Sequence, residues 1–393
     1  MLGFRGAAAL FGGLAVAIAC VAVACSVYDS SLLLPGTTDS GGQDVAEAAA
    51  PDVREAEAAP PPCPEDFPPS RPAMDDPSDA GDDVSVIVAL HTIDIIGNGG
   101  PPSGVGYDID NVWTCCDGGA HGGAESCTPP STGSMHYCDE NGGIDNNGGA
   151  LLSSFATLDP AQFSTASISQ RLEQGVYSIL LLIQQYNGTA NDEQVTGAIF
   201  ASPGVVGDAG AMWNGKDSWT IDQNYIASTN PLVPVYFDTN AFVANGVLVM
   251  RPPNFPFTLG TSSTGSFTVS LTAMVVTAKV TPAGDGTYRM TNGVLAGRWN
   301  VSDLLNAIQA VTYQGQPICR GGIIYESLIK PQICQYADIM TDPMRDLTGT
   351  KCDGLSLAAG FTADPALMGP VVSPTPKTTL CEGGTEAGPD ECP

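Results

Sequence analysis

The sequence predicts a mainly β fold with short helices, in the form of a β-sandwich-like domain braced by disulfides. Residues 84–96 and 267–281 alternate apolar with polar side chains and are rich in β-branched residues, which is typical of half-buried strands. Residues 177–183 are almost entirely apolar and predict a strand buried on both faces. Ten of the 12 cysteines lie beyond the N-terminal segment, and an even number favours a disulfide framework.

The first 24 residues are predicted to be a signal peptide. One positive charge, Arg5, precedes an unbroken run of apolar and small residues, which is the pattern of a secretory signal. Residues 22–26, Ala-Val-Ala-Cys-Ser, resemble the lipobox of bacterial lipoproteins, although Ala22 stands where that family more often has Leu. The resemblance implies cleavage before Cys25 and attachment of a lipid to this cysteine.

Two alternatives to this anchor stay open. Cys20 follows the small residues Ala-Ile-Ala and is a second candidate for lipidation, but Cys25 is favoured because Ser26 and a polar segment come after it. An uncleaved anchor helix is the other alternative, since the 19 apolar residues 6–24, rising about 1.5 Å each, can just cross a bilayer. In each case we expect an exported protein tethered to the lipid bilayer, at the outer membrane or the cell surface.

Residues 25–83 are predicted to be a disordered acidic linker rich in Pro and Ala. The stretch 27–83 contains ten prolines and 14 acidic residues but two basic ones, Arg54 and Arg71. Such a composition buries too little apolar surface to offset the entropy of the chain, and its charges repel one another. We therefore expect an extended spacer that leads to a single folded, β-rich domain at 84–393.

Three further elements are expected inside this domain. Residues 287–299 are the predicted hairpin partner of the strand at 267–281. One helix is expected to begin at Asp159-Pro160 and to end at Gly175, since Pro is favoured in the first turn of a helix and Gly just after its end. A second helix is expected from Ser302, with an apolar face formed by Leu304, Leu305, Ile308 and Val311.

The charge balance excludes nucleic acid as a partner. The chain has 42 acidic against 14 basic residues and a formal net charge of −28. Long-range repulsion should therefore keep its surface away from phosphate backbones and from anionic lipid headgroups.

Disulfides are expected in an exported protein, because the compartments outside the cytoplasm are oxidising. Pairing between near neighbours in the sequence is favoured, since four cysteines lie between 115 and 138 and most of the others lie near the C-terminus. Cys63 is expected to pair with a cysteine of the domain, and the adjacent Cys115 and Cys116 to have different partners. The ten candidates are Cys63, Cys115, Cys116, Cys127, Cys138, Cys319, Cys334, Cys352, Cys381 and Cys392.

Acidic and amide side chains around the first of these cysteines predict a calcium site. Calcium takes about six to eight hard oxygen ligands, and glycines let a short loop wrap around the ion. Residues 138–149 resemble the Cys-Asp-Gly-x-Asp-Asn-Asp-Cys repeats of secreted bacterial proteins, to which metal binding is ascribed, but they lack the second cysteine and the final aspartate. The candidate ligands are Asp108, Asp110, Asp139, Asn141, Asp145 and Asn147.

Two other interpretations of these loops stay open. Asn, Asp and Gly are also the residues of ordinary turns, so a structural loop without a metal is the simpler alternative. A zinc or copper site is the other, because His and Cys are ligands of those metals, but no Cys-x-x-Cys pair is present and disulfides are the expected use of the cysteines. The residues concerned are Cys115, Cys116, His121, Cys127, His136 and Cys138.

The chain also resembles uncharacterised surface lipoproteins of the myxobacterial type. The resemblance rests on residues 106–110 and 138–149, on the helix and buried strand at 165–183, on residues 293–298 and on the Cys-rich end. It covers most of residues 84–381. It implies a surface location, but no activity and no functional residue.

The sequence contains no complete catalytic motif. Residues 210–216 have the glycine and lysine spacing of a phosphate-binding loop, but Asp217 replaces the hydroxyl residue that holds magnesium, and residues 218–225 predict a strand where a helix is needed. We therefore expect a non-enzymatic structural or binding module of the cell envelope, with a carbohydrate or an envelope protein as its ligand. The alternative is a secreted polysaccharide hydrolase that uses paired carboxylates. The sequence does not exclude Asp108, Asp110, Asp222 or Asp238 from that role, but nothing in it nominates them.

Overall fold

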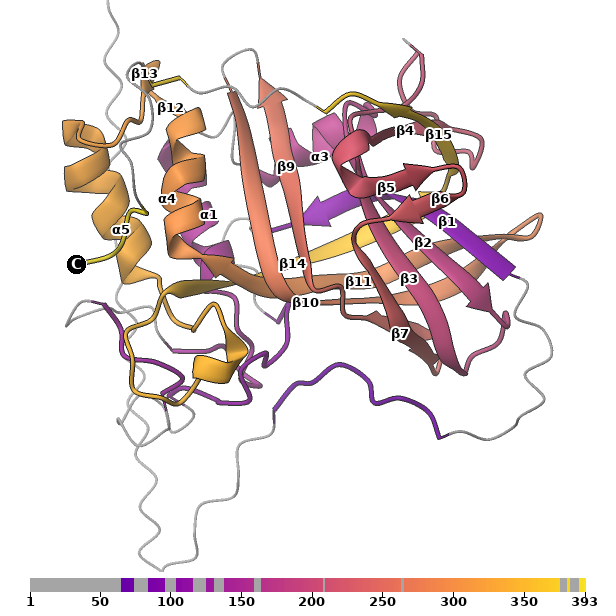
Figure 1. The fold of residues 1–393 in the computed structure, drawn as a ribbon, viewed down its shortest axis with the longest axis horizontal. Helices are drawn as coiled ribbons and strands as arrows, with labels where there is room; N and C mark the ends of the chain where they lie inside the picture. Colours follow the sequence, from indigo (N-terminus) through magenta and orange to yellow (C-terminus); the bar gives the residue numbers. More distant parts are fainter. Residues whose placement is uncertain are drawn as a thin grey trace, which may run out of the picture. The chain divides into compact units, whose positions relative to one another are not determined.

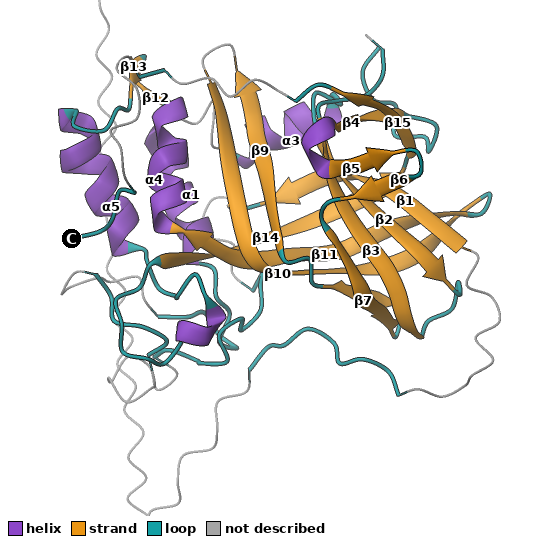
Figure 2. Cartoon of the chain, in the orientation of Figure 1, coloured by secondary structure: helices purple, strands orange, loops and turns teal. Residues whose placement is uncertain are grey.

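The main sheet contains nine antiparallel strands within the residues that the structure describes (Figures 1 and 2). The computed structural model describes residues 65–73, 84–95, 104–115, 125–130, 138–158, 164–207, 209–262, 265–374, 380–381 and 389–393. In the order of the sheet, the strands are β11 (Thr287–Asn300), β14 (Gly354–Pro365), β1 (Val84–Asp94), β2 (Ser178–Tyr186), β3 (Asp192–Ser202), β7 (Phe237–Ala244), β8 (Val247–Met250), β10 (Gly265–Gly284) and β9 (Asn254–Ser262). The predicted signal peptide, both lipidation candidates and most of the predicted linker lie outside the described residues.

The sheet closes on itself through β10, which is 20 residues long. Along one edge β10 pairs first with β9 and then with β8, and along its other edge it pairs with β11, the strand at the opposite end of the sheet order. Ala273, with a φ of 46°, lies at a register shift between the two halves of β10. Such a bulge bends a strand, which lets β10 serve two partners along one edge.

Side chains from all around the closed sheet meet in one hydrophobic core. Val88, Leu180, Val195, Leu248 and Leu271 come from five different strands, and each is at most 1% exposed. Opposite walls of the sheet therefore pack face to face, as the layers of a sandwich do. The predicted mainly β fold with short helices is confirmed.

The strands expected from sequence alternation agree with those observed. The segment at 84–96 contains β1, and the apolar segment at 177–183 lies largely in β2, whose first six residues are buried. The segments at 267–281 and 287–299 belong to β10 and β11, which pair as the expected antiparallel hairpin. Periodicity therefore located the strands that carry most of the core.

Short helices and small strand pairs complete the described structure. Helices α1, α4 and α5 lie at one end of the closed sheet, and α3 packs on β1 (Figure 2). None of the helices within the described residues is both long and apolar enough to span a membrane. The helices are α1 (Asn147–Leu158), α3 (Thr165–Glu173), α4 (Val301–Ala307) and α5 (Lys330–Gln335), with single turns η1 (Gln223–Tyr225), η2 (Ile308–Ala310), η3 (Tyr325–Ile329) and η4 (Pro343–Arg345). The remaining strands are β4 (Ser218–Asp222) with β15 (Leu367–Val372), β5 (Ile226–Thr229) with β6 (Leu232–Pro234), and β12 (Thr312–Tyr313) with β13 (Gln316–Pro317).

Two of the predicted helices are present. In α3, Ile168 and Leu172 are buried, and the N-cap is Ser164; the predicted start at Asp159-Pro160 lies outside the described residues. Helix α4 begins one residue before the predicted start at Ser302, because the side chain of Asn300 accepts hydrogen bonds from the backbone N–H groups of Ser302 and Asp303 and so caps the helix.

Helix α1 was not predicted, because its first residues have the composition of a turn. Residues 138–149 were expected to form a loop, but the helix begins at Asn147 and includes the next two glycines. Gly148 packs so closely on β14 that a Cβ atom there would lie 2.5 Å from the carbonyl oxygen of Ser356. This glycine therefore serves close packing between a helix and a strand, and not a turn.

Four disulfides hold the described residues together. Cys115–Cys138, Cys319–Cys381 and Cys334–Cys392 span 23, 62 and 58 residues, as expected for pairing between near neighbours. The expectation is wrong for Cys127, which pairs with Cys352 over 225 residues. The reason is that Thr128 lies beside residues 350–352, where the two segments exchange backbone hydrogen bonds. Cys63 and Cys116 lie outside the described residues.

Residues 65–73, which belong to the predicted linker, lie against the domain (Figure 1). The backbone of Asp66 donates to the carbonyl of Gly142 at 2.7 Å and accepts from the N–H of Asp108 at 3.0 Å. The guanidinium of Arg71 donates to the carbonyls of Glu193 and Asn240 and lies 4.8 Å above the ring of Phe242. The end of the linker is thereby attached at two places.

The C-terminus is held by a buried carboxylate. Asp390 is 3% exposed, accepts a hydrogen bond from Tyr325 and forms ion pairs with Lys330 and Arg320. Burial raises the pKa of Asp390, but the hydrogen bonds from Lys330 and Tyr325 and the two positive charges outweigh it, so the pKa lies below its usual value. Together with Cys334–Cys392, this contact attaches the last residues to α5 and η3.

Replacing Asp390 with Asn should lower the free energy of unfolding by about 1–3 kcal/mol at neutral pH, because hydrogen bonds and charges at a buried site are lost. A lowered pKa gives stability above the unfolded value of 3.8 that is lost as the pH falls through the folded value. Urea unfolding should therefore show a difference from the native chain at pH 7 that shrinks at about pH 2.5. A difference that is equal at both pH values would contradict the ionic role.

Candidate metal centre

Three buried carboxylates converge beside the start of α1. One oxygen from each of Asp108, Asp110 and Asp145 lies within 4.8 Å of the others, and the residues are 3%, 5% and 2% exposed. Oxygens bound to one calcium ion are each about 2.3–2.6 Å from it, so they can be no more than about 5 Å apart. The spacing of the three carboxylates fits a shared cation.

Backbone pairing between two loops brings these residues together. The N–H of Asp145 donates to the carbonyl of Tyr107 at 3.1 Å, and the N–H of Ile109 donates to Asp145 Oδ2 at 2.7 Å. Gly106 allows this approach, because its φ is 141° and a Cβ atom would lie 2.7 Å from Ile144 Cγ2. The loop at 104–115 and the segment at 138–146 therefore act as one unit.

The Cys115–Cys138 disulfide holds Asp139 beside the loop at 104–115. The bond closes the two segments next to Thr114, whose N–H donates to Asp139 Oδ2 at 2.6 Å. Burial raises the pKa of Asp139 to about 9, with further contributions from the charges of Asp110, Asp338 and Asp108. Asp139 is half-buried at the side of the three-carboxylate cluster.

Asp338 is the acidic residue that sequence reasoning missed. Its Oδ1 accepts from the backbone N–H of Ser356 at 2.9 Å, and burial raises its pKa to about 7. Its charge raises the pKa of both Asp139 and Asp145. The hydroxyl of Ser356 connects it to the segment that holds Asp145, because Ser356 Oγ donates to Asp338 Oδ2 and accepts from the N–H of Asn147. Asp338 lies almost 200 residues from Asp145 in the sequence and belongs to no ligand motif, so only the folded chain reveals it.

The oxygens of the cluster are incompletely satisfied. Asp108 Oδ1 and Asp110 Oδ1 both accept from the N–H of Val112, at 3.2 and 2.9 Å. Asp108 Oδ2 is buried and has no hydrogen-bond partner within the described residues. An ionised oxygen left in this state costs free energy, which a bound cation would offset.

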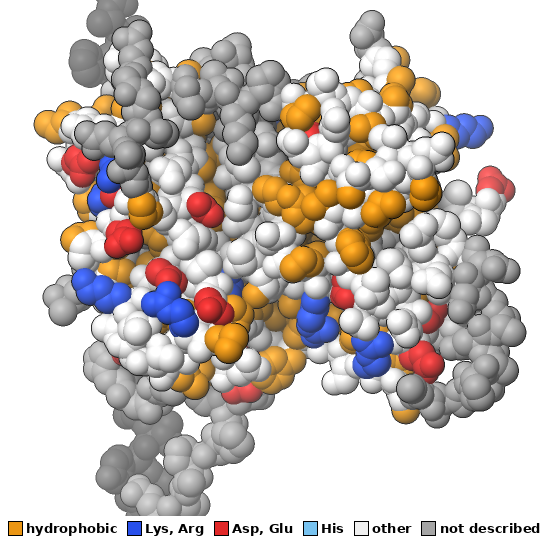
Figure 3. Space-filling view, viewed as in Figure 1, with side chains coloured by type: hydrophobic (Ala, Val, Ile, Leu, Met, Phe, Trp, Pro, Cys, Tyr) orange, Lys and Arg blue, Asp and Glu red, His pale blue; other side chains and the backbone are white. Residues whose placement is uncertain are grey.

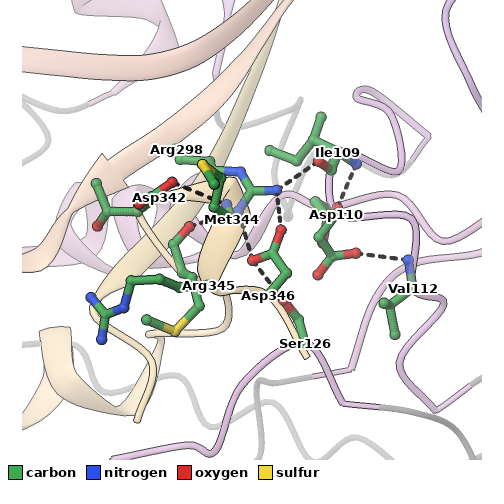
Figure 4. A network of polar contacts seen from close by, with 12 residues as sticks. Ile109, Asp110, Val112, Ser126, Arg298, Asp342, Met344, Arg345 and Asp346 are labelled. Atoms are coloured by element: carbon green, nitrogen blue, oxygen red, sulfur yellow. Dashed lines mark hydrogen bonds and ion pairs between the residues drawn. The ribbon is translucent and has the colours of Figure 1, made fainter. Parts of the chain in front are cut away.

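Arg298 carries a positive charge next to the cluster, but it is paired with a carboxylate outside the cluster, that of Asp346 (Figure 4). Its side chain, 1% exposed, forms two hydrogen bonds to Asp346, at 2.8 and 2.7 Å, and donates to the carbonyls of Met340 and Ile109. Ser126 also donates to Asp346, at 3.3 Å. Arg298 therefore joins β11 to two loops, and its charge is largely neutralised by Asp346.

Without a cation, the cluster retains protons. Burial raises the pKa of Asp110 to about 7, an effect that a hydrogen bond from Ser126 opposes and the charge of Asp108 increases. Burial, followed by the charges of Asp110 and Asp139, raises the pKa of Asp145 well above its usual value. A cation would replace these protons, because a positive charge favours the ionised carboxylates.

A cavity of about 340 Å³ adjoins the cluster at Asp108. Asn111, Arg251 and Phe67 also line it, and Phe67 comes from the attached end of the linker. The cavity therefore lies against Asp108, the residue that carries the unpartnered oxygen.

The other predicted ligands are less central. Asn141 is exposed in the turn before Gly142, and Asn147 is the first residue of α1, where its N–H donates to Ser356 Oγ at 2.9 Å. In the zinc or copper interpretation, Cys115, Cys127 and Cys138 cannot serve as thiolate ligands, because all three are in disulfides. His121 and His136 lie outside the described residues.

Comparisons with protein-family models, with curated proteins and with solved structures found no match for this chain. The geometry of the site therefore carries the functional argument.

Replacing Arg298 with Met should destabilise the domain strongly, because Asp346, whose side chain is 10% exposed, would lose its partner. Loss of one member of a buried ion pair costs about 3–5 kcal/mol. The matched control is Arg345→Met, which breaks the more exposed pair with Asp353 and should cost about 0–1 kcal/mol. Chemical unfolding of both variants tests the difference, and equal losses would contradict the role of Arg298.

Stability in the presence of a chelator should fall as the pH rises from about 5 to 9. The pKa values of Asp110 and Asp139 are raised in the folded state to about 7 and about 9. The stability that comes from their protonation is complete below the unfolded pKa and is lost as the pH rises through the folded values. Melting temperatures of the full chain at several pH values test this, and Asp110→Asn should flatten the curve around pH 7. A melting temperature that rises over this range would contradict it.

Proposed function

We propose that the protein is a non-enzymatic module of the cell envelope whose fold is stabilised by calcium. The observation that carries the proposal is the unpartnered oxygen of Asp108 within a cluster of three buried carboxylates. An acidic cluster alone is common on protein surfaces, but a buried ionised oxygen without a donor calls for a positive charge.

The ligand chemistry favours calcium over other metals. The cluster offers carboxylate oxygens on loops rich in backbone carbonyls, and hard oxygen ligands suit calcium, magnesium and manganese better than copper or zinc. Calcium accepts irregular geometry and many ligands, whereas magnesium requires a near-ideal octahedron. Loops joined by a disulfide and backbone hydrogen bonds fit the less demanding ion.

The position of the cluster supports a structural role for the ion. It lies between the loop at 104–115 and the segment that leads into α1, and the end of the linker crosses both loops at Asp66. A bound cation would cross-link these segments, much as Cys115–Cys138 does. Both kinds of cross-link suit an exported protein, since disulfides persist in oxidising compartments.

An exposed apolar patch supports a binding role. Hydrophobic side chains gather over β5 and β6 in Figure 3. Leu232, Val233, Val235 and Phe237 are each 36–42% exposed in this part of the chain. Contiguous apolar surface is typical of protein interaction sites, which favours an envelope protein as partner over a carbohydrate.

The same proposal includes the membrane location predicted from the sequence. A lipid on Cys25 would anchor the protein in the bilayer at the outer membrane or cell surface, and residues 25–64 would separate the domain from it. The net charge of −28 disfavours nucleic acid as a partner.

The hydrolase alternative has less support. Two carboxylates about 5–10 Å apart are sufficient for glycosidases, but they must face a sugar. Asp108 and Asp110 are at most 5% exposed, Asp238 accepts hydrogen bonds from the backbone of Asn240 and Arg251, and Asp222 lies in a different cavity. Within the described residues these four candidates do not line one common cavity.

Calcium should raise the melting temperature of the full chain with its disulfides intact. At 100 times its Kd, a ligand of the native state contributes about 2.7 kcal/mol, which is about 2–4 °C or less for a domain of this size. Asp108→Asn keeps the acceptor for Val112 but removes the charge, so it should abolish the rise. Asp222→Asn, a buried carboxylate outside the cluster, should preserve it.

Magnesium tests selectivity in the same assay and should give a smaller shift. If calcium leaves the melting temperature unchanged relative to chelator, the loop is an ordinary structural turn and the proposal fails. A rise that survives Asp108→Asn would place the ion elsewhere.

A further inference from the structure

A second cavity, far from the disulfide-linked loops in the sequence, lies at one mouth of the closed sheet. Its volume is about 240 Å³. Its walls come from β1, β2, β3 and β9, with the end of α3 and the turn η1 beside them. Strands β3 and β9 are not neighbours in the sheet order, yet they are in contact, so β9 folds across the mouth.

Most of the cavity wall is apolar or aromatic. Leu90, Leu172 and Phe257 are at most 3% exposed, and the ring of Tyr225 is 7% exposed. Val176, which is 40% exposed, lies at the rim. The cavity is therefore a lined pocket with access to solvent, and the mouth of a closed sheet is a common place for a small ligand.

Asp222 is a carboxylate in this pocket without a positive partner. It is 8% exposed, and its Oδ1 accepts from the N–H of Asn224 at 2.9 Å. No ion pair joins it to a cation within the described residues, whereas Asp346 is paired with Arg298 and Asp390 with Lys330. A buried carboxylate in an apolar wall calls for a positive charge, which a ligand could supply.

Three other polar side chains of the pocket, those of Ser178, Ser202 and Tyr225, also present acceptors. Ser178 donates its hydroxyl hydrogen to the carbonyl of Leu90 at 2.9 Å, and Tyr225 donates to the carbonyl of Pro256. Ser202 donates to the carbonyl of Gly204 at 3.3 Å. Because these three hydroxyl hydrogens are engaged with the backbone, Ser178, Ser202 and Tyr225 offer a ligand oxygen lone pairs. The hydroxyl of Tyr177, which also lines the pocket, is buried without a hydrogen-bond partner within the described residues. The complementary group is a donor with several hydrogens, as an ammonium group is.

The aromatic wall adds to this preference. Burial, followed by the negative charge of Asp222, raises the pKa of Tyr225 and of Tyr236, so both phenols lie near the carboxylate. The rings of Tyr225 and Phe257 line the same pocket as Asp222, and the ring of Tyr236 packs on that of Tyr225 at 5.3 Å between centroids. Aromatic rings attract positive charge. A carboxylate among aromatic rings is a suitable environment for an organic ammonium ion.

The volume limits the rest of the ligand. A cavity of about 150 Å³ admits benzene, so 240 Å³ has room for one such ring and a short chain. It is smaller than the roughly 300–1,000 Å³ of sites for drug-sized molecules. Oligosaccharides and nucleotides are therefore too large to be enclosed.

We propose that this pocket binds a small organic ammonium compound, with its apolar or aromatic body between β9 and α3 and its ammonium group on Asp222. The proposal goes beyond the calcium-stabilised module and does not depend on it, because the two sites share no residue.

Isothermal titration of the full chain with 2-phenylethylamine and with cyclohexylamine tests the proposal. At least one amine should bind, and its neutral analogue, 2-phenylethanol or cyclohexanol, should bind at least about tenfold more weakly, since a hydrogen bond to a charged group is stronger than a neutral one. The anion 3-phenylpropanoate should not bind. Failure of both amines, or equal affinity for amine and alcohol, would overturn the proposal.

Asp222→Asn should weaken amine binding at least about tenfold while keeping the Oδ1 acceptor that caps η1. Asp342→Asn is the matched control: Asp342 caps η4 through the same contact with the residue two positions ahead, but it is exposed and does not line the pocket. It should leave affinity unchanged. Asp108→Asn should also preserve amine binding, so failure of the calcium site and failure of this pocket are separate results.

A second variant tests the proposal independently in case Asp222→Asn fails to fold. Ala201→Leu reduces the pocket volume from β3 without touching the carboxylate, and should weaken binding of the ring-bearing amines. Amine binding that survives both Asp222→Asn and Ala201→Leu, in chains with native circular dichroism, would place the amine outside the pocket and overturn the proposal.

Discussion

A carboxylate that the fold buries must meet a positive charge, a proton or several hydrogen-bond donors, because an ionised group is costly to remove from water. With three acidic residues for each basic one, the chain has few internal cations for this task. The acidic residues in the interior therefore fall into two groups, those with a basic partner and those without one. Asp346 and Asp390 receive arginine or lysine, and these pairs hold the loop at 340–346 and the C-terminus. Within the described residues, no arginine or lysine forms an ion pair with the cluster at Asp108 or with Asp222.

The carboxylate cluster at Asp108 and the single carboxylate of Asp222 fit different kinds of cation. At the cluster, three carboxylates share one space, so a small divalent cation is the natural partner and its effect is to cross-link loops. At Asp222 a single carboxylate faces an apolar cavity, and the complementary species is a monovalent organic cation with a hydrophobic body. Both proposals have the same origin, because the chain has too few basic residues to pair with its buried carboxylates. The surroundings of each carboxylate determine which cation fits.

Local patterns predicted much of the fold, because the strands at 84–94, 178–186 and 267–281 follow the alternation or the apolar run that a pleated sheet imposes. Helix α1 escaped prediction because Asn147 and Gly148 resemble a turn, while their actual role is close packing on β14. Three candidate metal ligands, Asp108, Asp110 and Asp145, were predicted by residue type and do lie together, although nothing local indicated Asp338.

By itself, the sequence determined the mainly β class, the core strands, the acidic character and the use of cysteines in disulfides, because each depends on composition or on a period of two along the chain. The tertiary structure alone decided the closure of the sheet by β10 and β11, the Cys127–Cys352 bond and the pairing of Arg298 with Asp346. It also decided that Asp222 faces a cavity. These features join residues distant in sequence, and which distant groups meet depends on how the strands are ordered around the core, which no local pattern encodes.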